Sequence, residues 1–240
     1  MNKEETVKNL LEKTKYDFED LLLIMKVLRM EGGCAWDREQ THQSLRACMI
    51  EEAYEVVEAI DQKDEALLRE ELGDVLFQVV FHTQIEYERD AFSMDDVLQG
   101  ICEKMIRRHP HVFAEETAED ANAVIEKWEL IKAKEKQRKT KSAGLRSIPS
   151  VLPALMRAEK TSSKIGFSES ETVASLTEQI EKQAKQMNGQ DEALLAETLG
   201  GLLYKCASLA AFCGLDAEQL LGQAVEKAIL KVENEEKSKK

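Results

Sequence analysis

Apolar residues recur along this chain at the three- and four-residue spacing of amphipathic helices. The spacing predicts helices at 17–31, 41–62, 64–90, 93–108, 117–140, 153–165, 171–187, 190–213 and 216–235. With 3 Pro, 11 Gly and 5% aromatic residues, the chain lacks the turn signals and β-branched runs of a β protein. We therefore expect an all-α fold.

Local signals mark some of the helix ends. Ser93 with Asp96, and Thr117 with Asp120, have the spacing of a capping box, which indicates a helix start. Pro110 is expected to end the helix that precedes it.

Two stretches of the chain are near copies of each other. DEALLREELGDVLFQ at 64–78 returns as DEALLAETLGGLLYK at 191–205, an offset of 127 residues. The repeat favours two helical-bundle units rather than one core. We expect a first unit at 1–141, a polar and small-residue linker at 142–150 and a second unit at 151–240.

The two copies keep their leucines and differ at polar positions. The first copy has Glu71, Asp74 and Gln78, with His82 four residues further on, where the second has Thr198, Gly201 and Lys205, with Leu209 four residues further on. A polar strip that the second copy loses without losing its apolar pattern is not required for folding. This strip is therefore the candidate active site.

The helix predicted at 41–62 contributes two further carboxylates. At about 100° per residue, Leu45, Cys48, Met49, Val56, Ala59 and Ile60 form one apolar arc. Glu52 falls inside this arc and Glu55 lies at its edge, whereas Glu51 and Glu58 point to the opposite, solvent-facing side. The sequence thus separates two glutamates that face the protein from two that do not.

The helix predicted at 64–90 is apolar around most of its circumference, which is typical of a nearly surrounded helix. Gly73 within it suggests close approach of a neighbouring helix. Ionised carboxylates in such surroundings cost several kcal/mol each unless they are paired or bind a metal ion. Four of them, Glu52, Glu55, Glu71 and Asp74, therefore require a cation, and Mg²⁺ or Mn²⁺ suits oxygen-only ligands. Ordinary surface glutamates are the alternative.

Overall composition limits the classes of partner. The formal net charge of −13 repels nucleic acid, so no polynucleotide partner is expected. We find no signal peptide and no run near the roughly 18 apolar residues of a membrane span. Five cysteines, Cys34, Cys48, Cys102, Cys206 and Cys213, show no CxxC pair or zinc spacing. We interpret them as buried, reduced thiols of a cytoplasmic protein.

Several sequence blocks together resemble one known family. EEAYE at 51–55 followed by ELGD at 71–74 is similar to the EExxE and ExxD signature of MazG-type nucleoside triphosphate pyrophosphohydrolases, within the all-α NTP pyrophosphatase superfamily. Further blocks at 33–45, 71–82, 107–113 and 152–160 extend the resemblance over most of the chain.

This resemblance implies a fold of tandem MazG units, usually assembled as a homodimer. It also implies that Glu52, Glu55, Glu71 and Asp74 ligate Mg²⁺ and form the catalytic set. The implied reaction is attack of water on the α-phosphorus of a nucleoside triphosphate, which gives a nucleoside monophosphate and pyrophosphate.

Other polar and aromatic residues are candidates for supporting roles. Lys104, Arg107 and Arg108 lie within about one turn of each other and are candidates to bind phosphate, the alternative being a solvated basic helix end. Gln78 and His82 either support the carboxylates or form a satisfied buried pair. Trp36 and Trp128 either stack on a base or belong to the core.

The chain also departs from the family pattern. Ala35 replaces the expected Pro of the first block. Ungapped alignment places Gln179 and Lys182 opposite Glu52 and Glu55. A shift of one residue would recover Glu178 and Glu181 but not the pair lost at Thr198 and Gly201, so we do not expect a working metal site in the second unit.

Two rival functions follow from these departures and from the carboxylates. One is a non-catalytic nucleotide-sensing or protein-interaction module. The other, a di-iron carboxylate bundle, we set aside because the sole Glu-x-x-His spacing, Glu39 to His42, lies in or beside a loop.

Overall fold

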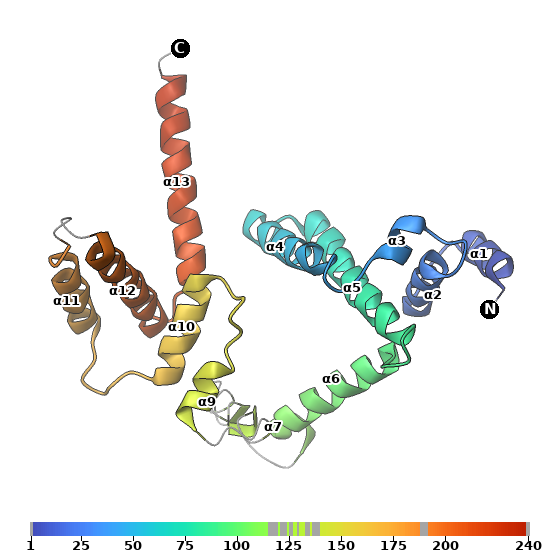
Figure 1. Ribbon diagram of the computed structural model, residues 1–240, viewed down its shortest axis with the longest axis horizontal. Coiled ribbons are helices and arrows are strands. Elements are labelled where there is room, and N and C mark those ends of the chain that lie inside the picture. Colours follow the sequence, from blue (N-terminus) through green and yellow to red (C-terminus); the bar gives the residue numbers. More distant parts are fainter. Residues whose placement is uncertain are drawn as a thin grey trace. The chain divides into compact units, whose positions relative to one another are not determined.

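Helices are the regular secondary structure of the part of the chain that the structure describes. The computed structural model describes residues 2–114, 120, 124, 127–128, 130–132, 135, 140–187 and 192–238 (Figure 1). These residues form α-helices joined by turns and loops, with no strand among them. The expectation of an all-α fold is confirmed.

The chain divides into two compact units, Met1–Val124 and Ile125–Lys240. This division falls earlier than the boundary expected at 141–151. The segment expected to be a linker begins with a helix that sequence analysis missed, α9 (Lys141–Arg146), which packs against the next helix, α10 (Ala154–Ile165). The predicted helix at 117–140 lies mostly outside the described residues.

The first unit is built around one long helix, α5 (Glu65–Tyr87), and the two helices that pack most closely on it. The described helices of this unit are α1 (Lys3–Glu12), α2 (Phe18–Arg29), α3 (Ala35–Glu39), α4 (Arg46–Gln62), α5, α6 (Met94–Arg108) and α7 (Pro110–Phe113). Within the unit, α4 lies along α5, α2 packs on the same long helix, and α6 starts beside its C-terminal end (Figure 1). Sequence analysis missed α1, α3 and α7.

The core of the first unit lies where α2, α5 and the start of α6 meet. Met25, Leu45, Val80, Phe81, Ile85 and Met94 form its buried apolar cluster. The C-terminal half of α5 is therefore its most buried part, and the first half stays open to solvent on one face.

Exposed positions on α4 and α5 correct three sequence-based expectations. Leu72 is 53% exposed and Leu76 is 41% exposed, so α5 is not surrounded on all sides within one chain. Ile60, predicted in the apolar arc of α4, is also exposed. A Cβ added at Gly73 would meet nothing within 4 Å, so among the described helices of the first unit none approaches it closely.

The second unit repeats the helix pair of the first and adds a long terminal helix. Its described helices are α9, α10, α11 (Val173–Ala184), α12 (Glu192–Phe212) and α13 (Ala217–Lys237). Both α10 and α11 pack on α12, with Ala207, Ala210 and Ala217 at the buried centre. The Asn188–Gly189 pair predicted as a loop lies outside the described residues.

Helix ends follow local side-chain chemistry. Ser93 caps α6 in a capping box with Asp96, as predicted, and its backbone N–H donates to the Asp96 carboxylate at 2.7 Å. α4 begins at Arg46 rather than at residue 41, because Thr41 and Ser44 bond each other's backbone in a preceding turn. Pro110 follows the end of α6 and also begins α7. The predicted cap at Thr117 lies outside the described residues.

All five cysteines are free thiols, as expected, but they are not all buried. Cys34 and Cys48 are half-buried, whereas Cys102, Cys206 and Cys213 are exposed. The exposed thiols lie on α6, on α12 and just beyond α12, where nearby apolar side chains such as Ile101 are also uncovered.

Among the described helices, none alone is both long and apolar enough to cross a membrane. By length and composition only, α12 and α13 pass this test as a pair, bent by 111° at the break between them.

Candidate active site

A tight turn places α4 and α5 side by side. Lys63 adopts the left-handed conformation with φ of 56°, which ends α4. Asp64 then caps α5 by accepting the backbone N–H groups of Ala66 and Leu67 at 2.9 and 3.0 Å. With so short a connection the two helices must run antiparallel. Side chains spaced one turn apart on α4 can therefore face side chains spaced one turn apart on α5.

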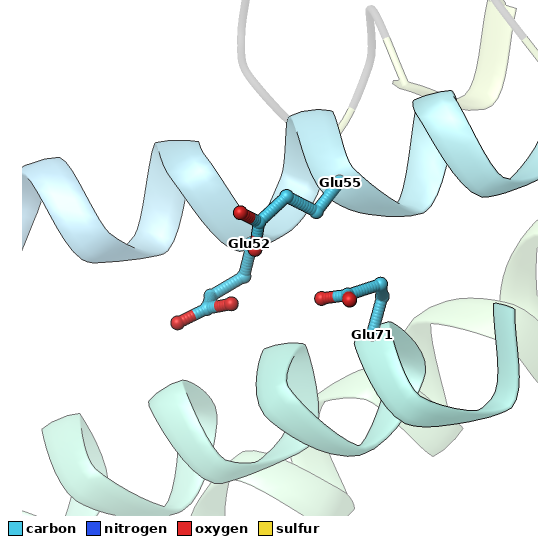
Figure 2. Close-up of side chains that lie close together, drawn as sticks. All are labelled: Glu52, Glu55 and Glu71. Carbon is cyan, nitrogen blue, oxygen red and sulfur yellow. The ribbon is translucent and has the colours of Figure 1, made fainter. Parts of the chain in front are cut away.

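Three glutamates meet between these helices. Carboxylate oxygens of Glu52, Glu55 and Glu71 all lie within 4.8 Å of one another. Glu52 and Glu55 extend from α4 toward Glu71 on α5 (Figure 2). Glu71 is buried, Glu52 is half-buried and Glu55 is exposed, so the cluster opens to solvent on one side.

Asp74, the fourth predicted ligand, is not part of this group. It is exposed on α5, one turn after Glu71. Its charge nevertheless reaches the cluster, because it acts on the pKa of both Glu52 and Glu71.

Burial and mutual repulsion together raise the pKa of two of the glutamates. Burial is the main cause that raises the pKa of Glu52, with Asp74 and Glu55 adding to it and the hydrogen bond from Gln78 opposing it. Burial also raises the pKa of Glu71, followed by the charges of Glu55 and Asp74. The arrangement therefore concentrates negative charge that a bound cation would relieve.

Gln78 lies one turn beyond Asp74 on α5 and contacts the cluster. Its Nε2 donates to Oε1 of Glu52 at 3.4 Å. Oε1 of Gln78 is buried and accepts no hydrogen bond from the described residues. A buried acceptor of this kind, beside carboxylates, suits a donor that enters with a ligand.

His82 belongs to a histidine pair that sequence analysis did not foresee. Its Nδ1 lies 2.7 Å from Nδ1 of His42, and the two rings stack with centroids 5.0 Å apart. Nε2 of His42 donates to Oε1 of Glu86 at 2.6 Å, and Arg89 also binds that carboxylate. With His42 neutral, its Nδ1 is the acceptor and His82 donates.

This network attaches the start of α4 to α5. Because His42 lies just before α4, its bonds hold the start of that helix against the C-terminal part of α5, where His82 and Glu86 lie. No signal in the sequence links His42 to Glu86, since the two residues are 44 positions apart. The sequence pattern pairs His42 only with Glu39, in a Glu-x-x-His spacing.

Trp36 lies at the surface on the short helix α3. It is 58% exposed, so it is not part of the core. Arg29, also missed from sequence, positions α3: its Nη1 donates to the backbone carbonyl of Asp37, while Nε and Nη2 bind the Glu88 carboxylate at 2.9 and 2.8 Å. Unlike Trp36, Trp128 is half-buried, and Nζ of Lys132 lies 4.3 Å from the centre of its ring.

The three predicted phosphate ligands lie near the C-terminal end of α6. Lys104 is half-buried, Arg107 is exposed and Arg108 is buried. A buried Arg108 does not fit a fully solvated basic helix end. Met94 anchors the other end of α6 in the core beside Ile85, so within this chain the basic residues lie far along α6 from that anchor.

Comparison with known proteins identifies the family. The model of the MazG nucleotide pyrophosphohydrolase domain matches residues 40–113, which include α4, α5 and α6. A Thermotoga maritima protein named nucleoside triphosphate pyrophosphohydrolase/pyrophosphatase MazG is 43% identical over 216 residues, covering 88% of this chain and 82% of the relative. The chain belongs to the MazG family.

Two further relatives are similar to this chain. An Escherichia coli nucleoside triphosphate pyrophosphohydrolase is 40% identical over 217 residues, covering 86% of this chain and 82% of the relative. The Bacillus subtilis protein YabN is 50% identical over 145 residues, which cover 60% of this chain and 29% of YabN. The MazG domain match contains all four predicted carboxylates of this chain.

Proposed function

We propose that this protein hydrolyses nucleoside triphosphates to nucleoside monophosphates and pyrophosphate at the carboxylate site of its first unit. The observation that carries the proposal is the meeting of Glu52, Glu55 and Glu71 within 4.8 Å across α4 and α5. Family membership supports it, because the Thermotoga maritima and Escherichia coli relatives are named for this activity.

The residues of the cluster fit a hard divalent cation. Glu52, Glu55 and Glu71 offer only oxygen ligands, and Asp74 is one turn away to complete the set. Such donors suit Mg²⁺, with Mn²⁺ as an alternative, rather than a metal that prefers sulfur or imidazole. The raised pKa values of Glu52 and Glu71 are consistent with a site whose charge is balanced only when a cation is bound.

The reaction breaks the bond between the α-phosphorus and the oxygen that bridges it to the β-phosphorus. Water supplies the new oxygen on the α-phosphorus, its proton passes to a carboxylate of the cluster, and the bridging oxygen leaves with pyrophosphate. A bound Mg²⁺ supplies positive charge that neutralises the phosphate oxygens. Glu52, Glu55, Glu71 and Asp74 form the catalytic set.

Other residues are assigned to substrate binding and support. Lys104, Arg107 and Arg108 bind the phosphates, since cations on one helix end suit a polyanion. The exposed Trp36 stacks on the base. Gln78 orients Glu52, and His82 holds α4 through His42.

Assembly as a homodimer accounts for apolar surface that one chain leaves open. Leu72 and Leu76 of α5 are exposed beside Gly73, and α13 exposes Leu221 and Val225. Apolar faces of this kind are typical of subunit interfaces. The free cysteines favour a reducing compartment such as the cytoplasm.

A non-catalytic nucleotide-sensing or protein-interaction module is the second candidate. The observation that favours it is the second unit, where Thr198 and Gly201 replace Glu71 and Asp74. Such a module would bind nucleotides without converting them.

Hydrolysis in ¹⁸O-labelled water distinguishes these candidates. The purified protein is incubated with Mg²⁺ and a panel of standard and modified nucleoside triphosphates, and the products are identified by mass spectrometry. We expect monophosphate and pyrophosphate, with the label in the monophosphate. Release of inorganic phosphate, label in pyrophosphate, or nucleotide binding without any product would each contradict the proposed reaction.

A further inference from the structure

The second unit contains a cavity between α10, α11 and α12. Its volume is about 290 Å³, near the lower end of the roughly 300–1,000 Å³ typical of small-molecule sites. Polar side chains from all three helices line it: Ser162, Gln179, Gln183, Tyr204, Lys205 and Ser208.

This cavity occupies the position that the carboxylate site has in the first unit. In the first unit, Nε2 of Gln78 donates to Oε1 of Glu52 at 3.4 Å. In the second, Nζ of Lys205 donates to Oε1 of Gln179 at 3.2 Å. The repeat offset of 127 residues converts one pair into the other, and both contacts join residues 26 positions apart on paired helices. The duplicated helices therefore keep the same register.

The charge at this position is inverted between the units. Four carboxylates of the first unit are replaced by Gln179, Lys182, Thr198 and Gly201, and the neutral Gln78 by Lys205. The first set attracts a divalent cation. The replacing set has no carboxylate and two ammonium groups, of which Lys205 lines the cavity, so it attracts an anion.

Gln183 fills the space that an aspartate side chain would need. Its Nε2 donates to the backbone carbonyl of Thr198 at 2.9 Å. A Cβ at position 201 would collide with this amide, so Gly201 is what allows Gln183 to enter. The second site is thus rebuilt around a neutral amide, and is not simply a metal site that lacks its ligands.

The cavity walls combine hydrogen-bonding groups with apolar surface. The hydroxyls of the buried Ser162 and Ser208 lie 2.6 Å apart, and Ser162 also donates to the Tyr204 hydroxyl at 3.1 Å. Phe167 and Leu176 provide apolar surface. Glu171 also lines the cavity, with its carboxylate accepting the backbone N–H of Ser168 at 2.7 Å.

We propose that this cavity binds a small organic phosphate directly, without a divalent cation. The ammonium group of Lys205 and the hydroxyls contact the phosphate, which offers several acceptor oxygens, and the apolar wall contacts the organic part. The proposal does not depend on catalysis in the first unit.

Calorimetric titration of the full chain with adenosine 5′-monophosphate, in EDTA, tests it. We expect saturable binding with a Kd below about 1 mM, unchanged when Mg²⁺ replaces EDTA. Inorganic phosphate should bind at least about tenfold more weakly, because it lacks an organic part to contact the wall.

Substitutions locate the binding. Lys205→Gln should weaken it at least about tenfold through loss of a charge-assisted hydrogen bond, and Lys205→Arg should retain it. Lys185→Gln is the matched control, because Lys185 is exposed just after the end of α11 and its Nζ lies 3.9 Å from Oε2 of Glu181. Circular dichroism verifies that each variant is folded. No saturable binding, a requirement for Mg²⁺, equal affinity for inorganic phosphate, or undiminished binding by Lys205→Gln would each overturn the proposal.

Discussion

Gln78 donates a hydrogen bond from its side-chain Nε2 to Oε1 of Glu52 across the interface of α4 and α5, at 3.4 Å. The donor is neutral, so it orients the carboxylate and opposes the rise of its pKa without cancelling its charge. A lysine at this position would neutralise Glu52 and compete with a cation. The second unit has this substitution, at Lys205, and has lost the carboxylates as well.

Gln78→Leu is expected to weaken Mg²⁺ binding by about 10–100-fold, the usual effect of removing a partner that orients a metal ligand. The loss follows because Glu52 then holds its proton more tightly and is no longer oriented. The Mg²⁺ dependence of nucleotide hydrolysis measures it. Gln84→Leu, which removes the amide that binds Glu88 at 2.9 Å on the same helix, should leave this dependence unchanged. Equal Mg²⁺ dependence in both variants would show that Gln78 has no such role.

Glu71→Gln is expected to raise the melting temperature of the metal-free protein at pH 7.5, because it removes one of three mutually repelling carboxylates. Stabilisation by Mg²⁺ should, in contrast, require the Glu71 carboxylate. At 100 times its Kd, Mg²⁺ should stabilise the unsubstituted protein by about 2.7 kcal/mol, and the variant much less. Thermal unfolding in EDTA and in Mg²⁺ measures both effects. Equal stabilisation of the two proteins by Mg²⁺ would place the ion elsewhere.

The same carboxylates should make stability depend on pH. The pKa of Glu52 and of Glu71 is raised above the ordinary value of 4.5, so their favourable contribution is present at low pH and is lost as pH rises through the raised values. In EDTA, the deficit of the unsubstituted protein relative to Glu71→Gln should therefore shrink as pH falls from 7.5 toward 5. Denaturant unfolding at a series of pH values measures this gap, and a gap that widens on acidification would refute the assignment.

His82 should contribute with the opposite sign. Burial, followed by the neighbouring His42, lowers the pKa of His82 below the ordinary 6.5. Its contribution to stability is present above pH 6.5 and is lost as pH falls through the lowered value. His82→Gln should therefore flatten the decline in unfolding free energy below pH 6.5, whereas His111→Gln should not. Parallel pH curves for the His82→Gln variant and the unsubstituted protein would rule out this coupling.

Sequence periodicity predicted the helices that pack lengthwise and missed those held by side-chain contacts. α5 and α12 have long apolar repeats, so both were found within a few residues. α3 was missed because its position depends on Arg29, whose guanidinium contacts the backbone of Asp37 and the carboxylate of Glu88. Such contacts join distant residues and leave no periodic signal.

The candidate site was partly visible in the sequence for a related reason. Helical spacing places Glu52 and Glu55 on one face of α4, and the difference between the two repeated stretches singles out Glu71. These two patterns together predict the cluster. They could not show that Asp74 is exposed, or that His42 stacks on His82. The exposure of Leu72 was missed because a pattern of apolar residues indicates which side chains favour burial. It does not indicate whether another element of the same chain packs against them.

The location of catalysis in the first unit is tested most directly by comparing Glu71→Gln with Glu197→Gln. Glu197 is an exposed glutamate on α12, adjacent to Thr198, the counterpart of Glu71. Pyrophosphate release at saturating Mg²⁺ is measured for both variants. We predict a loss of at least about 100-fold for Glu71→Gln, beyond what removal of an orienting partner produces, and no loss for Glu197→Gln. An undiminished rate in Glu71→Gln would contradict the assignment of the active site.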